Sequence, residues 1–235
     1  AANTFAGVLR DGAAGTLALT KTGGGTLTFS GSSPNTYIGL TTVSAGTLEL
    51  NKTPESNAIA GDIVVNGGAL TLAANHQIAD TSDITVNGAG RFNTGSSNYA
   101  DTIRNLTMDS SVTDPNTNRV NNLTVTDTLM VKRGAVGVYS GCSLAAGTLD
   151  MSGGSIMGLA GNTADTTVDI GAGGLIMSGA TLRFGWIWSG ILDSPKTIRV
   201  NLDGNFTGSG TNSLDYVTTL GPRLLDLQGA TRTFD

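Results

Sequence analysis

The chain has 235 residues and a formal net charge of −5, with 34 glycines and a charged fraction of 13%. The abundance of glycine, threonine, asparagine and serine argues against a helical bundle, the hydrophobic fraction of 39% argues against disorder, and the acidic balance argues against nucleic-acid binding. A single cysteine and a single histidine exclude a zinc site of those residue types, and no apolar run is long enough for a membrane-spanning helix.

A pentapeptide of glycine followed by alternating apolar residues recurs along the chain. It occurs at 15–19, 25–29, 46–50, 68–72 and 147–151 and, with one extra residue, at 179–184. The copies that begin at Gly25, Gly46 and Gly68 lie 21 and 22 residues apart. A fixed period near 20 residues indicates a solenoid, in which each repeat forms one coil.

A second short strand precedes many of these pentapeptides. Its apolar pairs are Thr41/Val43, Ile63/Val65, Ile84/Val86, Leu106/Met108, Leu123/Val125, Val168/Ile170 and Ile198/Val200. Glycine and asparagine separate the two strands, as at 66–68, and both residues adopt the sharp bend that a corner requires. The predicted unit is therefore a strand, a glycine-rich corner and a second strand.

Within each strand, apolar and polar residues alternate with a period of two. Leu48 and Leu50 should face an interior, while Thr47 and Glu49 should face water. We therefore predict an all-β protein that folds as a right-handed parallel β-helix (β-solenoid) of about 21 residues per coil, with roughly ten or eleven coils over residues 1–235 as a single domain. The less regular stretches 93–119 and 185–195 are expected to form protruding loops or coils of different length.

The stretch Lys21–Thr53 reads KTGGGTLTFSGSSPNTYIGLTTVSAGTLELNKT. It resembles the autotransporter-associated β-strand repeat, also called the passenger-associated transport repeat, of bacterial surface and secreted proteins. The matching residues are Lys21, Gly23, Gly25, Thr26, Leu27, Ser30, Gly31, Asn35, Thr36, Tyr37, Gly39, Thr41, Val43, Gly46, Thr47 and Leu48, whereas Phe29 replaces a leucine and 32–34 form a longer insert. The resemblance implies a parallel β-helix, an extracellular or cell-surface location, and a structural spacer without catalytic residues.

The sequences at the two ends of the chain suggest that the chain pairs with further coils. In proteins of this family, a segment similar to GATRTF at 229–234 runs into one similar to the N-terminal stretch, so the C-terminal end resembles the upstream neighbour of the N-terminal end. An uncovered end of a β-helix is an unpaired sheet edge, which pairs with other strands. We therefore expect either one unit of a longer tandem rod or separate protomers that stack head to tail into an open filament.

These observations predict a structural protein of the bacterial exterior that contributes to a surface fibre and has itself as its partner. It is not expected to be an enzyme, and no catalytic, cofactor-binding or metal-binding residue is assigned. The alternatives are an adhesin or a stalk that binds cell-surface glycans, and then a polysaccharide-active β-helix enzyme. The densest charged group, Asp193, Lys196 and Arg199, is interpreted as a solvated loop, and His76 as a structural or surface residue.

Two segments have the spacing of calcium-loop ligands. Asp114, Asn116 and Asn118 follow it, but Arg119 and Val125 replace the turn glycine and the bidentate acid. The second segment offers three oxygen-bearing side chains at Asn201, Asp203 and Asn205. Both are interpreted as turns capped by their own side chains.

The aromatic segment 183–192 places Phe184, Trp186 and Trp188 on one strand face. Three interpretations stay open: rings that fill a widened coil, a lateral or end-on protein interface, and a glycan-stacking platform. The lone thiol of Cys142 is interpreted as a small buried group.

Overall fold

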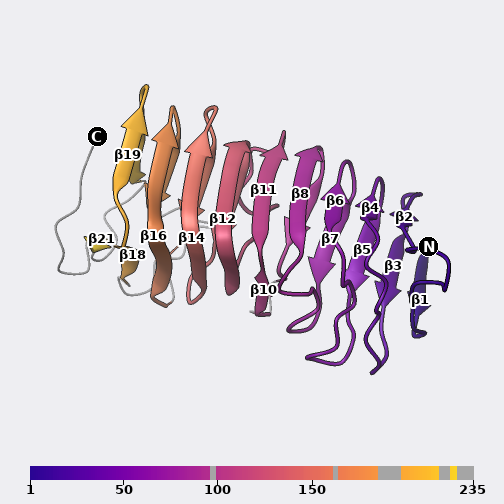
Figure 1. Ribbon diagram of the computed structural model, residues 1–235. Coiled ribbons are helices and arrows are strands. Elements are labelled where there is room, and N and C mark those ends of the chain that lie inside the picture. Colours follow the sequence, from indigo (N-terminus) through magenta and orange to yellow (C-terminus); the bar gives the residue numbers. More distant parts are fainter. Residues whose placement is uncertain (96–98, 161–163, 185–196, 217–222, 227–235) are drawn as a thin grey trace.

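The computed structural model describes residues 1–95, 99–160, 164–184, 197–216 and 223–226, and every regular element within them is a β-strand (Figure 1). All pairs of strands are parallel, and the chain winds as a solenoid of about nine turns with roughly 22 residues per turn. The predicted parallel β-solenoid is therefore confirmed, with a period close to the 21 residues expected.

The strands form three lengthwise faces. Face 1 contains β2 (Leu19–Lys21), β4 (Thr41–Val43), β6 (Ile63–Val65), β8 (Asp83–Gly88), β11 (Asn105–Ser110), the second halves of β12 (Leu123–Arg133), β14 (Ser143–Ser152) and β16 (Thr166–Ser178), and β19 (Phe206–Ser209). Face 2 contains β1 (Ala2–Phe5), β3 (Thr26–Phe29), β5 (Thr47–Leu50), β7 (Ala69–Leu72), β9 (Arg91–Asn93), β13 (Ala135–Val138), β15 (Ile156–Leu159), β17 (Thr181–Phe184) and β20 (Ser213–Tyr216). Face 3 contains β10 (Asp101–Ile103), the first halves of β12, β14 and β16, β18 (Ile198–Leu202) and β21 (Arg223–Asp226).

The core consists of apolar side chains stacked in columns between the three faces. Leu27, Leu48, Leu70 and Phe92 are successive register partners on face 2, as the sequence predicts for the first three. The last three are fully buried, whereas Leu27 is half-buried near the N-terminal end of the solenoid. Each fully buried leucine contributes roughly 1.5–3 kcal/mol to stability.

The corners between faces show why asparagine, aspartate and glycine are so frequent. Asp62 Oδ1 accepts a hydrogen bond from Asp83 N (2.9 Å), and Asn105 Oδ1 accepts one from Thr128 N (3.1 Å) in the next coil. These side chains thus continue the inter-coil ladder where the backbone turns away from it. At Gly46 the backbone has φ of 66°, and a Cβ atom there would lie 2.3 Å from Gly25 O, so no larger residue fits.

The structure corrects the predicted assignment of strands to columns. Leu106 and Met108 of face 1 pair with Leu129 and Val131, whereas the pair Leu123/Val125 lies on face 3. Val168/Ile170 and Ile198/Val200 also lie on face 3, and the pentapeptide 147–151 belongs to face 1 rather than to the column of Leu48. The error arises because β12, β14 and β16 bend through the corner without leaving the sheet, and a period of two looks the same on every face.

The stretch 93–119 is also more regular than predicted. It contains β10 and β11, and β11 pairs in unbroken register with β8 from Asn105 to Ser110. The bend between β10 and β11 is occupied by Arg104, whose exposed side chain pairs with Asp83, rather than by a glycine. Towards the C-terminal end, successive face 2 partners Leu182 and Leu214 lie 32 positions apart, so the chain makes about nine turns rather than ten or eleven.

Candidate functional site

The predicted aromatic and charged groups of 184–199 are only partly described. Trp186, Trp188, Asp193 and Lys196 lie outside the described residues. The ring of Phe184 is 8% exposed and belongs to the core, and Arg199 on β18 forms an ion pair with Asp226 on β21, with Nη1 and Oδ2 3.0 Å apart. The guanidinium of Arg199 is therefore engaged by the neighbouring coil.

His76 and Cys142 have the surroundings of structural residues. His76 Nε2 lies 3.5 Å from Glu55 Oε1 at the surface, and both residues occupy turns with positive φ. Cys142 is 4% exposed, and burial raises the pKa of its thiol, which lowers its nucleophilicity. Burial of Cys142 agrees with the interpretation of its sequence.

The segment 114–119 is a turn followed by a core residue. Asp114 Oδ1 accepts hydrogen bonds from the backbone N and side-chain Nδ2 of Asn116, at 3.0 and 2.9 Å. Asn118 instead points inward, where its Oδ1 accepts from Phe92 N and its Nδ2 donates to Ala135 O, both at 3.1 Å. The three side chains that have calcium-loop spacing therefore do not converge.

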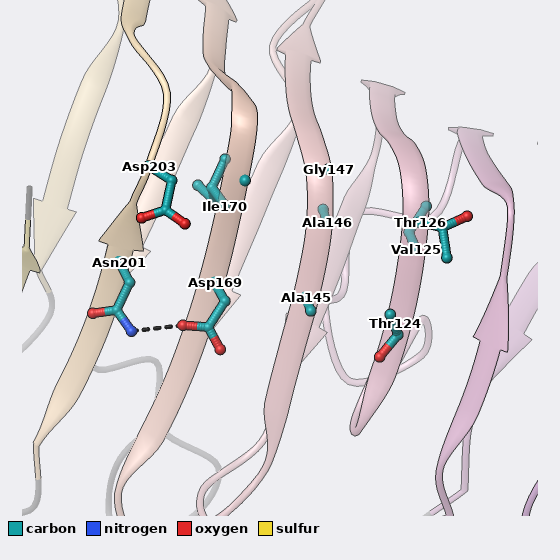
Figure 2. Close-up of a pocket in the computed structure, with 11 residues that line it drawn as sticks. Thr124, Val125, Thr126, Ala145, Ala146, Gly147, Asp169, Ile170, Asn201 and Asp203 are labelled. Atoms are coloured by element: carbon teal, nitrogen blue, oxygen red, sulfur yellow. Dashed lines mark hydrogen bonds between the residues drawn. The ribbon is translucent and has the colours of Figure 1, made fainter. Parts of the chain in front are cut away.

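A shallow groove crosses the corner between faces 3 and 1 (Figure 2). Its floor contains Ala145 and Gly147 of β14, and Asp169 and Asn201 stand on one side of it, where Asn201 Nδ2 donates to Asp169 Oδ1 at 2.6 Å. Gly147 is required for packing, because a Cβ atom would lie 2.5 Å from Thr126 O. Within the described residues, no three histidine, cysteine, aspartate or glutamate side chains are close enough together to hold a metal ion.

Two lysines are buried among carbonyl groups rather than beside acids. Lys52 is 1% exposed, and its Nζ donates to Gly7 O (3.1 Å), Ser30 O (3.0 Å) and Ser33 O (2.9 Å). Lys21 is 7% exposed, and its Nζ donates to the carbonyls of Thr22, Gly23 and Ala45 at 2.8–3.0 Å. Each ammonium group thus satisfies carbonyls at turns of successive coils.

Asp101 is the buried acid of the described residues. Its Oδ2 accepts hydrogen bonds from Gln77 N (2.9 Å) and Ile78 N (3.3 Å), and its Oδ1 accepts one from Thr102 N (2.9 Å). Burial raises the pKa of Asp101 to about 7, although these N–H groups and nearby His76 lower it. Asp101, Lys21 and Lys52 all lie at inward positions. Each is two residues from an apolar residue or next to a turn. The sequence analysis assigns none of the three to the interior.

Asp101 predicts that the protein is more stable at acidic than at neutral pH. The unfolded carboxyl keeps its ordinary pKa of 3.8, so between about pH 4 and 7 the folded state alone binds the proton, and stability falls as the pH rises. The full loss is on the order of 4 kcal/mol, of which about 2–3 kcal/mol falls between pH 5 and pH 8. Urea unfolding at pH 5 and pH 8 measures it, with Asp101→Asn as the comparison. If the variant and the parent show the same pH dependence, the assignment is wrong.

Among the described residues, partly exposed apolar side chains that pack against the core lie at both ends of the solenoid. At the C-terminal end, side chains from all three faces, including Leu182, Phe206 and Leu225, surround a cavity of about 70 Å³. Leu214 beside it is 55% exposed, whereas its register partner Leu182 is 1% exposed. At the N-terminal end, Leu19 and Leu27 line an open groove together with Asn3.

Comparison with known proteins gives a family match for one part of this solenoid. No curated protein and no solved structure matches the chain significantly. No helix of the described residues is long and apolar enough to cross a lipid bilayer. The family model described as passenger-associated-transport-repeat matches residues 19–50, which run from β2 to β5. The first complete coils of this solenoid therefore match the passenger-associated transport repeat, in agreement with the motif of Lys21–Thr53.

Proposed function

We propose that the chain is a structural segment of a secreted or surface-exposed bacterial passenger, and that it contributes to a fibre by stacking end to end. The transport repeat at residues 19–50 and the β-solenoid fold support a passenger-type domain. The observation that carries the fibre is the continuity of the faces: every strand pair is parallel, from β1 and β2 at one end to β19 and β21 at the other (Figure 1).

Such continuity makes the two ends complementary. On face 2, the outermost strands are β1 and β20. Within the described residues, each of them has a strand partner on one side only. Parallel strands have a direction, so the free edge of β20 and the free edge of β1 carry matching donors and acceptors. A head-to-tail contact of this kind does not close on itself and therefore generates an open filament.

The described outer surface favours a scaffold over a catalyst. Several of its charges stand in ion pairs, such as Arg104 with Asp83, where Nη2 and Oδ2 are 2.7 Å apart, and Arg133 with Asp109. The Arg104 guanidinium lowers the pKa of Asp83, so this carboxylate stays ionised and paired. A carboxylate held in such an ion pair is not available as the acid or base that glycoside hydrolysis uses.

Electron microscopy and sedimentation velocity test the proposal on the 235-residue chain. We expect rods that lengthen in steps of one protomer as the concentration is raised, because nucleation at an open end requires only the contact itself. Rods of one protomer length at all concentrations up to the millimolar range would overturn it. Labelling of intact cells with an antibody against the chain tests the exterior location, and labelling only after lysis would contradict it.

A further inference from the structure

The geometry points to a defined register for the end-to-end contact: Ala2–Phe5 of one copy adds to Ser213–Tyr216 of the next, with Asn3 opposite Leu214. This inference rests on the proposed function and specifies its interface. Both strands belong to face 2, whose inward column runs Asn3, Leu27, Leu48 at one end and Met157, Leu182, Leu214 at the other.

The continuity of this inward column selects the register, because it brings Asn3 opposite Leu214. Asn3 is the register partner of Leu27, so it occupies a core position of the end strand, yet it is exposed. A polar residue at an inward position is costly unless the coils on both sides supply hydrogen-bond partners.

Asn118 shows how the same column accommodates an asparagine. It is fully buried on face 2, where its neighbour Arg119 forms parallel β-bridges with Asn93 of the preceding coil and Gly137 of the following coil. Its Oδ1 accepts from the aligned residue of the preceding coil, Phe92 N, and its Nδ2 donates to a carbonyl of the following coil, Ala135 O. Both hydrogen bonds require a coil on each side.

Asn3 lies within the regular strand β1, whereas Asn118 lies in a bend, so at Asn3 the backbone ladder makes the pairings that the side chain of Asn118 makes in its coil. Ser213 N donates to Ala180 O and Thr26 N donates to Ala1 O, so the backbone groups of Leu214 and Ala2 face the two free edges. In the proposed contact, Leu214 N of the neighbouring copy therefore donates to Ala2 O in the parallel ladder, and the amide of Asn3 takes the core position opposite Leu214.

The apolar part of the contact lies beside this amide. Leu214, 55% exposed, and the half-buried Phe206 and Leu225 form the rim of the C-terminal cavity. Phe5 and Leu27 are half-buried at the N-terminal end. A coil placed on each end buries these groups, which is the hydrophobic driving force for association.

Paired cysteines test the register. Ala2 and Ser213 are outward, exposed positions that would face each other at the parallel strand spacing of about 4.8 Å, which a disulfide spans. In a Cys142→Ala background, Ala2→Cys with Ser213→Cys should give a ladder of oxidised multimers. Thr4→Cys with Ser213→Cys, shifted by two residues, should give at least about tenfold less cross-linked product, because its Cα atoms are too far apart.

An asparagine variant tests the role of the amide. Asn3→Asp keeps an acceptor but loses the donor and adds a charge, so the concentration needed for assembly should rise by roughly tenfold to a hundredfold. Because Asn3 is exposed in the single chain, its melting temperature should stay within about 2 °C of the parent's. Thr47→Asp, which adds the same charge at an outward position of β5 away from the contact, is the matched control and should assemble like the parent.

The outcomes separate the two proposals. Filaments that form but cross-link equally at both cysteine pairs, or that tolerate Asn3→Asp as well as Thr47→Asp, would overturn this register while leaving the fibre in place. Absence of any filament from the parent chain would overturn the fibre and the register together.

Discussion

Replacing Leu48 by aspartate is expected to prevent the chain from folding. Leu48 lies at the centre of a column between Leu27 and Leu70, and it is 0% exposed. The substitution removes about 2–5 kcal/mol of packing and buries an unpaired carboxylate, whose cost adds to this loss. The sum approaches or exceeds the whole stability of a typical domain, about 5–15 kcal/mol. Circular dichroism and the yield of soluble protein measure the result.

The matched control for this variant is Thr47→Asp. Thr47 is the preceding residue of β5 and faces outward, with Thr26 and Ala69 as its register partners. The same carboxylate there should change stability by less than about 1 kcal/mol. A Leu48→Asp variant that melts like the parent would show that Leu48 faces water and that the register of face 2 is wrong.

Replacing Lys52 by methionine is expected to destabilise the protein by about 2–4 kcal/mol, although the two side chains have similar volume. The ammonium donates to the carbonyls of Gly7, Ser30 and Ser33, and methionine leaves all three without this donor. Because Gly7 belongs to the N-terminal segment and Ser33 to the turn before β4, the loss loosens the first coils selectively. Urea unfolding measures the total effect.

Hydrogen exchange of residues 1–17 measures where the loss falls, and Lys132→Met is its control. Lys132 lies on β12 with an exposed side chain, so its replacement removes a charge without uncovering a buried carbonyl. We expect Lys132→Met to keep the exchange pattern of the parent, while Lys52→Met accelerates exchange around Gly7. Equal stability of the two variants would show that the carbonyl contacts of Lys52 contribute nothing.

The parallel solenoid could be predicted from the sequence because its signal is repeated. The glycine-led pentapeptides at Gly25, Gly46 and Gly68 recur at the length of one coil, and the alternation within each strand states which side faces the core. The column of Leu27, Leu48 and Leu70 follows from these two facts alone. The motif of Lys21–Thr53 indicates the family on independent grounds.

The assignment of strands to faces could not be predicted in the same way. Leu123 and Leu129 lie in one continuous strand but on different faces, because β12 bends between Val125 and Thr128 without a glycine. Nothing in a period of two distinguishes such a bend from a straight strand. The sequence pattern therefore places strands of the third face in the same column as strands of the first face.

The buried charges escaped prediction for a different reason. Lys52 and Asp101 are polar by composition, and their burial depends on backbone groups that other coils supply, from Gly7 for the lysine and Gln77 for the aspartate. The sequence alone does not show which backbone groups of other coils will lie beside these side chains. Lys21 offered a partial signal, since it follows Leu19 by two residues and so shares its inward direction.

Distances between spin labels along one face test the central claim, which is that successive coils stack in parallel register around one axis. Thr42, Met130 and Thr207 are outward positions on face 1, with Met130 four register steps from Thr42 and Thr207 seven steps from it. In a Cys142→Ala background, labels at Thr42 and Met130 should lie about 19 Å apart, and labels at Thr42 and Thr207 about 34 Å apart, from a rise of about 4.8 Å per coil. Distances that do not increase from the first pair to the second would contradict the parallel solenoid.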